Sequence, residues 1–268
     1  MKNTEELLPI AQHAAIEAGT AIMNIYKEDF DVEFKVDESP LTIADKEANQ
    51  VIMSYLLPIG IPVISEENRE IPYAERKEWE TFWIVDPLDG TKEFIKKNGE
   101  FTVNIALIHQ GIPVLGVIYV PANKELFFGN ESGAFKQINI EHKTDLIHSE
   151  KIKLSPKPAT EKVKVVASRS HLSAETEEFI QKIKNTVGVE SIETVSSGSS
   201  LKICMIADGS ADVYPRYAPT MEWDVAAGHA ICRAAGVKIL QAGSESELEY
   251  NKENLLNPWF VVGDRFGS

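Results

Sequence analysis

Cysteine is scarce in this sequence of 268 residues, which contains only Cys204 and Cys232. Both cysteines lie in apolar stretches that we expect to be helical, and their spacing fits no metal-binding motif. The count argues against a secreted fold held together by disulfides and against a cysteine zinc site. We therefore expect two buried thiols in a reduced, cytoplasmic protein.

Positive charge is also in short supply, because 27 Lys and Arg stand against 41 Asp and Glu, giving a net charge of −14. Proteins that bind nucleic acids present a basic surface, so we expect no nucleic-acid partner. A site for an anion must then be a local exception, built from metal ions and a few well-placed cations.

Long apolar runs are missing too, since no stretch approaches the roughly 20 residues needed to cross a membrane. The first residues also lack the charged and apolar regions of a secretion signal. We expect no transmembrane segment, and contact with the inner face of the cell membrane stays open.

The length and the apolar content of 43% are enough for a large core, either in one domain or in two closely packed halves. We predict an N-terminal α+β half at residues 1–150 and a C-terminal α/β half at 151–268, with the active site between them. The polar stretch 138–161 is the best candidate for a linker.

In the first half, apolar spacing predicts an amphipathic helix at residues 4–27. Thr42 can cap a second helix at residues 43–57. Short strands are expected at residues 62–65 and 82–85. A strand-rich stretch from Phe101 to Phe135 is typical of an antiparallel meander, with its main strands at residues 103–108, 114–120 and 125–128.

In the second half, strands and helices alternate, which predicts a layered α/β arrangement. The strands are expected at residues 163–167, 192–195, 211–214, 237–240 and 259–262. The helices are expected at residues 173–184, 199–207 and 224–235.

The stretch from Trp83 to Thr91 carries the clearest chemical signal. An apolar strand is expected to end at Asp86-Pro87, because proline cannot donate to a sheet ladder. Asp86 and Asp89 then follow on a turn, where paired carboxylates suit Mg²⁺. Backbone N–H groups of Gly90 and Thr91 suit a phosphate oxygen. The alternative is ordinary turn chemistry, and the motif alone does not decide between the two.

Three further carboxylates are candidates for the same site. Glu66 follows a strand and would join Asp86 and Asp89 if the two strands are neighbours, a clustering that is costly without cations. Asp45 falls in the first turn of a helix, where favourable interaction with the helix dipole is by itself sufficient explanation. Asp224 either caps the following helix or brings a fourth carboxylate to the metals from the second half.

Three polar loops at strand ends in the second half suggest a pocket for an anionic ligand. They are Ser168 to His171, Ser196 to Lys202 and Tyr214 to Arg216. Each has an ordinary structural explanation when taken singly. Together, in an acidic protein, they favour a site that binds anions.

These segments, taken together, resemble the inositol monophosphatase-like superfamily of Mg²⁺-dependent, lithium-sensitive phosphatases. The resemblance spans nearly the whole chain and implies the inositol monophosphatase/fructose-bisphosphatase-like fold, with alternating α-β-α-β-α layers. Its motifs, in order, are Ser39 to Asp45, Ser65 to Glu67, Asp86 to Thr91 and Trp223 to Gly228.

Within this superfamily the sequence is most similar to the bacterial 3′(2′),5′-bisphosphate nucleotidases. Inositol monophosphatases typically carry Thr-Asn where this chain has Lys92-Glu93. The similarity rests on residues 89–104 together with the three polar loops. It implies removal of the 3′-phosphate from 3′-phosphoadenosine 5′-phosphate (PAP) to give AMP, clearing a by-product of sulfate assimilation. The implied partner is this small nucleotide, and the protein would be a monomer or a homodimer.

The resemblance also implies roles for individual residues. Glu66, Asp86 and the Leu88 carbonyl would bind one Mg²⁺, and Asp86, Asp89 and Asp224 a second, in a site for two or three ions. Glu66 and the Asp45–Thr91 pair would orient and deprotonate the attacking water. Gly90 and Thr91 would hold the scissile phosphate. Ser199, Lys202, Arg216 and His171 would bind the rest of the nucleotide.

Three alternatives stay open. A haloacid-dehalogenase-type phosphatase also has Asp-Gly-Thr after a strand, but its two aspartates are two residues apart, whereas Asp86 and Asp89 are three apart. A sugar phosphatase acting on inositol phosphates or fructose bisphosphate would keep the same fold. A non-catalytic nucleotide sensor would bind its ligand without turnover.

Overall fold

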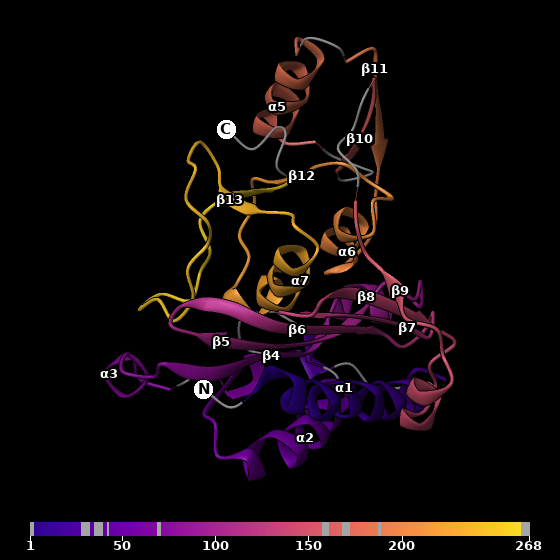
Figure 1. Cartoon of the computed structure of the whole chain (residues 1–268), viewed down its shortest axis with the longest axis vertical. Helices are drawn as coiled ribbons and strands as arrows, with labels where there is room; N and C mark the ends of the chain where they lie inside the picture. The colour runs from indigo at the N-terminus through magenta and orange to yellow at the C-terminus, as the bar shows by residue number, and fades with distance from the viewer. Residues whose placement is uncertain are drawn as a thin grey trace.

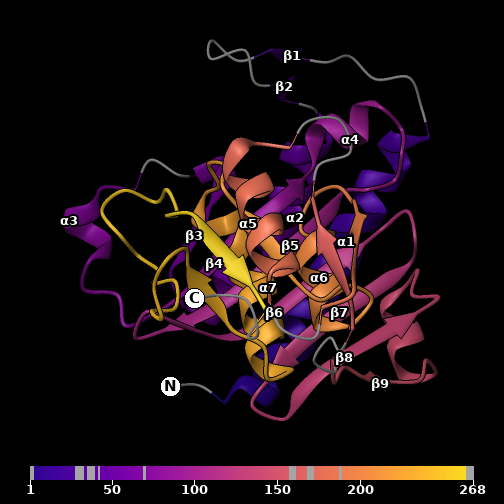
Figure 2. The ribbon, with the colours of Figure 1, turned by 90° about the horizontal axis from the view of Figure 1, so that it is seen from above.

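The protein is built in layers of helices and sheets, as Figures 1 and 2 show for a computed structural model. The structure describes residues 3–27, 33–34, 40–41, 43–68, 71–156, 161–167, 172–186 and 189–263. The order from bottom to top in Figure 1 is helices, a large sheet, helices, smaller sheets and a last helix. This mixed α/β layering agrees with the expected fold class.

The first layer consists of α1 (Thr4–Tyr26) and α2 (Ile43–Leu56), which match the two predicted helices. The side chain of Asn3 caps α1 by accepting a hydrogen bond from the backbone N–H of Glu5 at 3.0 Å. Both helices bury their alanine-rich faces against one side of the large sheet, in a cluster that includes Val85. Between the helices, the two-residue strands β1 (Glu33–Phe34) and β2 (Pro40–Leu41) pair antiparallel.

The large sheet has seven strands in the order β3-β4-β5-β6-β7-β8-β9. The β3–β4 pair is parallel, and every later neighbour is antiparallel, so the predicted meander is confirmed. The strands are β3 (Val63–Ser65), β4 (Thr81–Asp89), β5 (Thr102–His109), β6 (Ile112–Val120), β7 (Glu125–Asn130), β8 (Gly133–Ile138) and β9 (Ile152–Lys153).

Two expectations about this sheet are wrong. The strand that was expected to end at Asp86-Pro87 continues to Asp89, with a register irregularity between Asp86 and Asp89. Proline is tolerated at such an irregularity because no ladder hydrogen bond is required of it there. The stretch 138–161 is more than a linker, because the turn η3 (Lys143–Ile147) leads into β9, which completes the sheet.

The other face of the sheet is covered by α7 (Glu222–Ala234), with α6 (Leu201–Ala207) packed beside it. The α7 backbone comes very close to the sheet because β6 presents Gly116 and β7 presents Gly129 beneath it. A Cβ at Gly116 would overlap the carbonyl oxygen of Ala227 and lie 2.8 Å from the Cβ of Ala230. Helix α7 of the second half therefore shares a core with the sheet of the first half.

The outer layers belong to the second half of the chain. One sheet has the order β12-β14-β13, and β10 pairs with β11 in parallel. Val165 in β10 bridges to Val213 just before β12, which joins the two sheets. The strands are β10 (Lys162–Val166), β11 (Ser191–Val195), β12 (Tyr214–Arg216), β13 (Ile239–Gln241) and β14 (Phe260–Val262). Helix α5 (Ala174–Lys184) forms the last layer in Figure 1.

Short helical turns occupy several connections: η1 (Leu57–Ile59), η2 (Glu66–Asn68), α3 (Tyr73–Arg76) and α4 (Thr91–Ile95). Cys204 and Cys232 are buried and free, as expected. Among the described residues, no helix is both long and apolar enough to cross a membrane. The division of the chain at residue 150 stays a prediction.

We expect Gly116→Ala to lower the free energy of unfolding by about 1–3 kcal/mol, because the added methyl group must push α7 away from the sheet. Urea denaturation of the purified variant measures this loss. Ile112→Ala is the matched control on the same strand, since the Ile112 side chain is 45% exposed. Equal unfolding midpoints for Gly116→Ala and the wild-type protein would contradict the close approach.

Candidate active site

Five carboxylates meet near the end of β4. Burial is the main cause that raises the pKa of Asp86 well above its usual value, and the charges of Glu66, Asp89, Asp224 and Asp45 add to it in that order. Asp86 and Asp89 come from β4, Glu66 from the turn after β3, Asp45 from α2 and Asp224 from α7. The structure thus brings together every carboxylate that the sequence analysis singled out.

The irregularity in β4 lets two aspartates three residues apart take part in one site. Asp86 pairs with Asn104 on β5, and Asp89 pairs with Thr102. Between them, the side chain of Leu88 is buried in the core on the α1/α2 side of the sheet. The Leu88 backbone is involved in the site, since its N–H donates to Asp86 Oδ1 at 3.1 Å.

The aspartates are held by donors of the chain itself. Asp89 Oδ2 accepts hydrogen bonds from the hydroxyls of Ser199 at 2.6 Å and Ser200 at 2.8 Å. Asp224 Oδ2 accepts one from the backbone N–H of Met221 at 2.8 Å. Within the described residues, no three His, Cys, Asp or Glu side chains are arranged as a ready-made metal site.

The chemistry of this donor set nevertheless fits a hard cation. The cluster consists of oxygen ligands only, and its members raise the pKa of Asp86 through like-charge repulsion. A divalent cation would relieve that repulsion. The individual metal roles of Glu66, Asp86, Leu88, Asp89 and Asp224 stay predictions.

Asp224 illustrates the electrostatic cost of the cluster. It lies in the first turn of α7, where its bond from Met221 caps the helix, so the capping role considered for it is present. Burial, followed by the charge of Asp89, raises the pKa of Asp224 to about 7. Without a cation, the charged form of Asp224 is therefore less favourable at neutral pH in the folded protein than in the unfolded chain.

Three more of the predicted site residues lie around the carboxylate cluster: Thr91, Gly90 and Asp45. Gly90 has a φ of +94°, a conformation that favours glycine, and it leads into α4. Thr91 Oγ1 lies 3.5 Å from the Leu88 carbonyl oxygen, to which it donates. Asp45 is 4% exposed in the first turn of α2. The pairing of Asp45 with Thr91 stays a prediction.

The loop before α6 approaches this cluster from the second half of the chain. Gly198 is pressed against the α4–β5 connection, where a Cβ would lie 2.7 Å from the Glu100 carbonyl oxygen. Ser199 follows with a φ of +50°, which is unusual for a residue other than glycine. Helix α6 begins only at Leu201, and the hydroxyls of both serines bind Asp89 rather than capping it.

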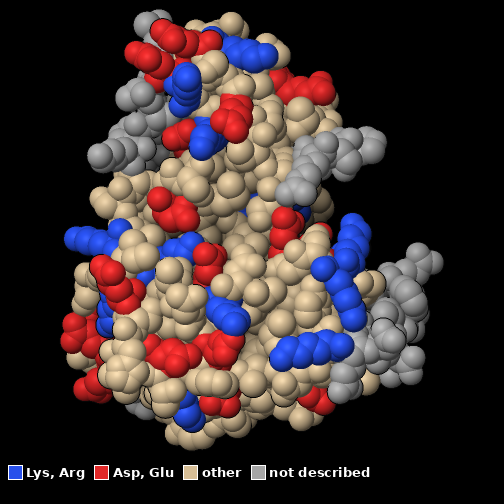
Figure 3. All heavy atoms as spheres, turned by 90° about the vertical axis from the view of Figure 1, so that its right-hand side faces the viewer, with Lys and Arg blue, Asp and Glu red and all other residues tan. Residues whose placement is uncertain are grey.

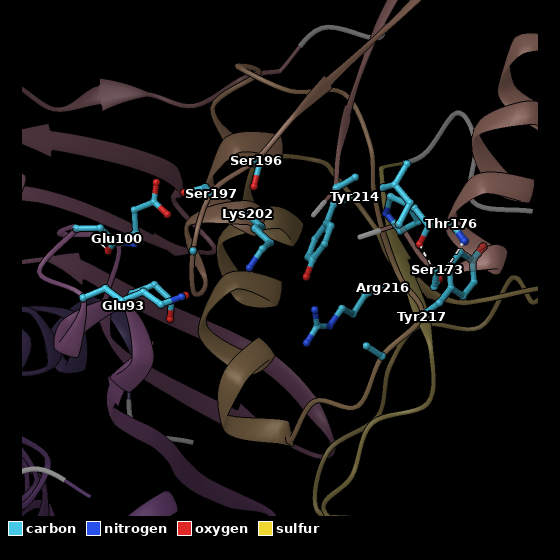
Figure 4. Close-up of a pocket in the computed structure, with 17 residues that line it drawn as sticks. Glu93, Glu100, Ser173, Thr176, Ser196, Ser197, Lys202, Tyr214, Arg216 and Tyr217 are labelled. Carbon is cyan, nitrogen blue, oxygen red and sulfur yellow. Dashed lines mark hydrogen bonds between the residues drawn. The ribbon is translucent and has the colours of Figure 1, made fainter. Parts of the chain in front are cut away.

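Beside the carboxylates lies a cavity of about 450 Å³. Figure 4 shows Lys202 from α6 and Tyr214 and Arg216 from β12 pointing into a common space. Burial lowers the pKa of Lys202, and the negative charge of Asp89 is the main interaction that opposes this shift. The two cations supply the local positive charge that an acidic protein needs to bind an anion.

Basic and acidic side chains are interspersed over most of the described face that Figure 3 shows, and several basic side chains lie close together at its lower right. The pair formed by Lys202 and Arg216 belongs to the lining of the cavity.

Sequence reasoning gave no individual role to several residues of the cavity. Tyr214 is buried, and burial raises its pKa to about 12, although the positive charge of Arg216 opposes the rise. Alternation along β12 could have found it, because residues two apart in a strand share a face. Glu93 and Glu100, on the opposite side in Figure 4, also received no individual role. His171, together with the loop from Ser168, lies outside the described residues.

The family model of the inositol monophosphatase family matches residues 3–262. The chain belongs to this family. It is 44% identical to the 3′(2′),5′-bisphosphate nucleotidase CysQ of Salmonella typhimurium, over 92% of this chain and 96% of that protein. It is 32% identical to the CysQ of Haemophilus influenzae, over 97% of this chain and 94% of that one.

Solved structures agree with this assignment. The crystal structure of CysQ from Bacteroides thetaiotaomicron, a bacterial member of the family, is 51% identical and superimposes with a TM-score of 0.84. The match covers 96% of both chains. The extragenic suppressor protein SuhB from Bartonella henselae is 26% identical with a TM-score of 0.71, over 97% of this chain and 95% of that one.

The raised pKa of Asp224 predicts a pH-dependent effect of Asp224→Asn in protein kept free of metal by EDTA. The folded pKa of about 7 lies above the usual 3.8, so the wild-type carboxyl favours folding below pH 4 and loses that advantage as the pH rises towards 7. Asparagine does not titrate and can still cap α7. The variant should therefore become the more stable protein by about 2–4 kcal/mol above pH 7.

Urea denaturation of both proteins between pH 4 and pH 8 measures this difference. The gap in unfolding free energy should widen up to about pH 7 and then level off. Saturating Mg²⁺ should reverse its sign, because only the wild-type protein keeps the full set of carboxylates. A gap that does not change with pH would contradict the electrostatic cost assigned to Asp224.

Proposed function

We propose that this protein is a metal-dependent phosphatase that hydrolyses the 3′-phosphate of 3′-phosphoadenosine 5′-phosphate, giving AMP and phosphate. The single observation that carries the proposal is the convergence of five carboxylates beside a cavity containing Lys202 and Arg216. The bisphosphate nucleotidases at 44% identity supply the substrate class. By the same reasoning, the protein clears a by-product of sulfate assimilation.

Glu66, Asp86, Asp89 and Asp224, with the carbonyl oxygen of Leu88, are the groups that would hold Mg²⁺, in two or three positions. When bound there, Mg²⁺ would lower the pKa of a water nucleophile and stabilise negative charge on the leaving oxygen. Oxygen ligands of this kind are the ones that Mg²⁺ prefers.

The residues of the chain itself bind and orient the reactants. The N–H groups of Gly90 and Thr91 contact the scissile phosphate, where charge builds up during the reaction. Glu66 and the hydroxyl of Thr91 hold the attacking water, and its proton passes by way of the Thr91 hydroxyl to the carboxylate of Asp45. No covalent phosphoenzyme is needed in this scheme.

Lys202 and Arg216 bind the 5′-phosphate, which is not cleaved. A guanidinium group suits this task because it donates two parallel hydrogen bonds to a phosphate. Arg216 Nη2 donates to the Pro219 carbonyl oxygen at 3.3 Å, which helps to place the guanidinium at the cavity. Ser199 and His171 stay candidates for contacts with the nucleotide. The buried thiols of Cys204 and Cys232 favour a reducing compartment, so we place the reaction in the cytoplasm.

The proposal is tested by phosphate release from 3′-phosphoadenosine 5′-phosphate, inositol 1-phosphate and fructose 1,6-bisphosphate. We expect the nucleotide to have the highest kcat/KM, with activity lost in EDTA and lowered by lithium. Preference for inositol 1-phosphate or fructose bisphosphate would replace the nucleotide assignment with a sugar phosphatase. Tight nucleotide binding without turnover would replace it with a sensor.

Asp89→Asn is the matched variant for the metal-dependent part of this test. It keeps the size of the side chain and should abolish turnover at limiting Mg²⁺, because one charged ligand is lost. Near-normal turnover under those conditions would remove Asp89 from the metal site.

A second prediction separates the 5′-phosphate site from the reaction centre. Arg216→Ala should raise KM for 3′-phosphoadenosine 5′-phosphate by about 10- to 100-fold, since charge-assisted hydrogen bonds of about 1.5–3 kcal/mol are lost. Adenosine 3′-monophosphate, which lacks the 5′-phosphate, is the control substrate, and its KM should change little. An equal rise in KM for both substrates would show that Arg216 does not bind the 5′-phosphate.

A further inference from the structure

A small group of buried polar residues lies directly behind the carboxylates and has no role in the function proposed above. Thr102 and Asn104 are neighbours on one face of β5, and Ser200 precedes α6. All three are nearly inaccessible, at 0%, 1% and 3% exposure. Buried polar side chains are costly unless they are hydrogen-bonded, so their partners identify what they hold in place.

Ser200 is the centre of this group. Its Oγ lies 2.8 Å from Asp89 Oδ2 and 2.8 Å from the backbone carbonyl oxygen of Asp224. One hydroxyl therefore lies within hydrogen-bonding distance of acceptors on two members of the carboxylate cluster, one from the sheet and one from α7. The two halves of the chain meet at this atom.

Asn104 and Thr102, on the side of Ser200 away from the carboxylates, orient the Ser200 hydroxyl. The side-chain amide of Asn104 donates to Ser200 Oγ at 2.9 Å, and Thr102 donates to Asn104 Oδ1 at 2.9 Å. Because Asn104 donates to Ser200, the Ser200 proton is left to point forward. Its two possible acceptors are Asp89 Oδ2 and the Asp224 carbonyl oxygen, and the charged carboxylate is the stronger one.

The same network determines which oxygen of Asp89 accepts the serine hydrogen bonds. Ser199 also donates to Asp89 Oδ2, and its Oγ lies 2.7 Å from Thr102 Oγ1. Both serine hydroxyls thus converge on Oδ2, and neither of them contacts Oδ1. The left-handed backbone of Ser199 makes this convergence of two consecutive residues possible.

We propose that Ser200, held by Asn104 and Thr102, is a positioning residue that fixes the Asp89 carboxylate relative to α7 and so sets the geometry for binding a divalent cation. The inference rests on the proposed metal-dependent function. Its physical basis is that partners behind a metal ligand hold the ligand in orientation, and their loss commonly lowers metal affinity by about 10- to 100-fold.

The test is isothermal titration of the substrate-free protein with MgCl₂. Ser200→Ala should bind Mg²⁺ about 10- to 100-fold more weakly than the wild-type protein, because Asp89 loses one of its two hydroxyl donors. Ser200→Thr keeps the hydroxyl and should restore most of the affinity. Thr102→Val leaves the Ser200 contact in place and should show a smaller loss in the same direction.

Kinetics supply a second readout that a merely structural residue would not change in this way. The kcat of Ser200→Ala should approach that of the wild-type protein as Mg²⁺ is raised, while KM for the nucleotide stays close to normal. Tyr119→Phe is the matched control, because it removes another buried hydroxyl bond, to the Ile140 carbonyl at 2.6 Å, far from the carboxylates. It should lower stability without changing Mg²⁺ affinity.

The outcomes separate this inference from the proposed function. If the wild-type protein binds Mg²⁺ and turns over the nucleotide but Ser200→Ala binds Mg²⁺ equally well, the positioning role is overturned alone. If the wild-type protein neither binds Mg²⁺ nor needs it for turnover, the proposed metal-dependent function and the positioning role of Ser200 are both overturned. Should Ser200→Ala fail to fold, unchanged Mg²⁺ affinity in Thr102→Val would overturn the role.

Discussion

Repulsion between buried carboxylates is the constraint on which the rest of this structure depends. Burial disfavours the charged form of each aspartate, and the charges of its neighbours add to that cost, which is why the pKa values of Asp86 and Asp224 are raised. The fold supplies hydrogen-bond donors to one oxygen of Asp86, Asp89 and Asp224. A cation is the natural complement for the negative charge that is left.

Holding such a cluster requires rigid elements on both sides, which explains why α7 packs so closely. Glycine at positions 116 and 129 lets the helix lie on the sheet, and Gly228 lets α6 lie on α7, where a Cβ would come within 2.7 Å of Ile203. Asp224 sits at the start of the same helix. Close packing therefore serves the site, because a displaced α7 would also displace a carboxylate.

Much of this fold could be predicted from the sequence, and the failures have physical reasons. Apolar periodicity located α1, which buries one face, and a capping signal located α2. Apolar runs located the strands of the meander, which are buried on both faces. The prediction failed at Pro87. Proline on its own favours the end of a strand, whereas the bulge that accommodates Pro87 depends on pairing with the neighbouring strand β5. The short strands near Tyr214 and Ile239 were displaced by one to three residues for the same reason, since pairing sets their ends.

The site shows the same division between local and long-range information. Asp86, Asp89 and Gly90 could be identified as candidate site residues because they stand together in a short motif. Asp45 and Asp224 could not be identified in this way, since each has a sufficient local role at a helix start. Only the family resemblance indicated that they belong to the site. Thr102 and Asn104 lie in the stretch 89–104 on which the similarity rests, but the sequence gives them no role, because alternation along a strand predicts burial and not the partner. Their bonds to Ser199 and Ser200 span almost 100 residues.

In the function that we propose, the acidic composition contributes to the selectivity of the cavity. With a net charge of −14, the protein repels anions over long distances, so a bisphosphate would bind only where Lys202, Arg216 and metal ions reverse the local sign. Glu93 and Glu100 line the same cavity and oppose any additional negative group. A ligand with two separated phosphates can satisfy the cations and the metal site at once. A sugar monophosphate reaches only the metal site and leaves Lys202 buried without a counter-charge from the ligand, which favours the bisphosphate.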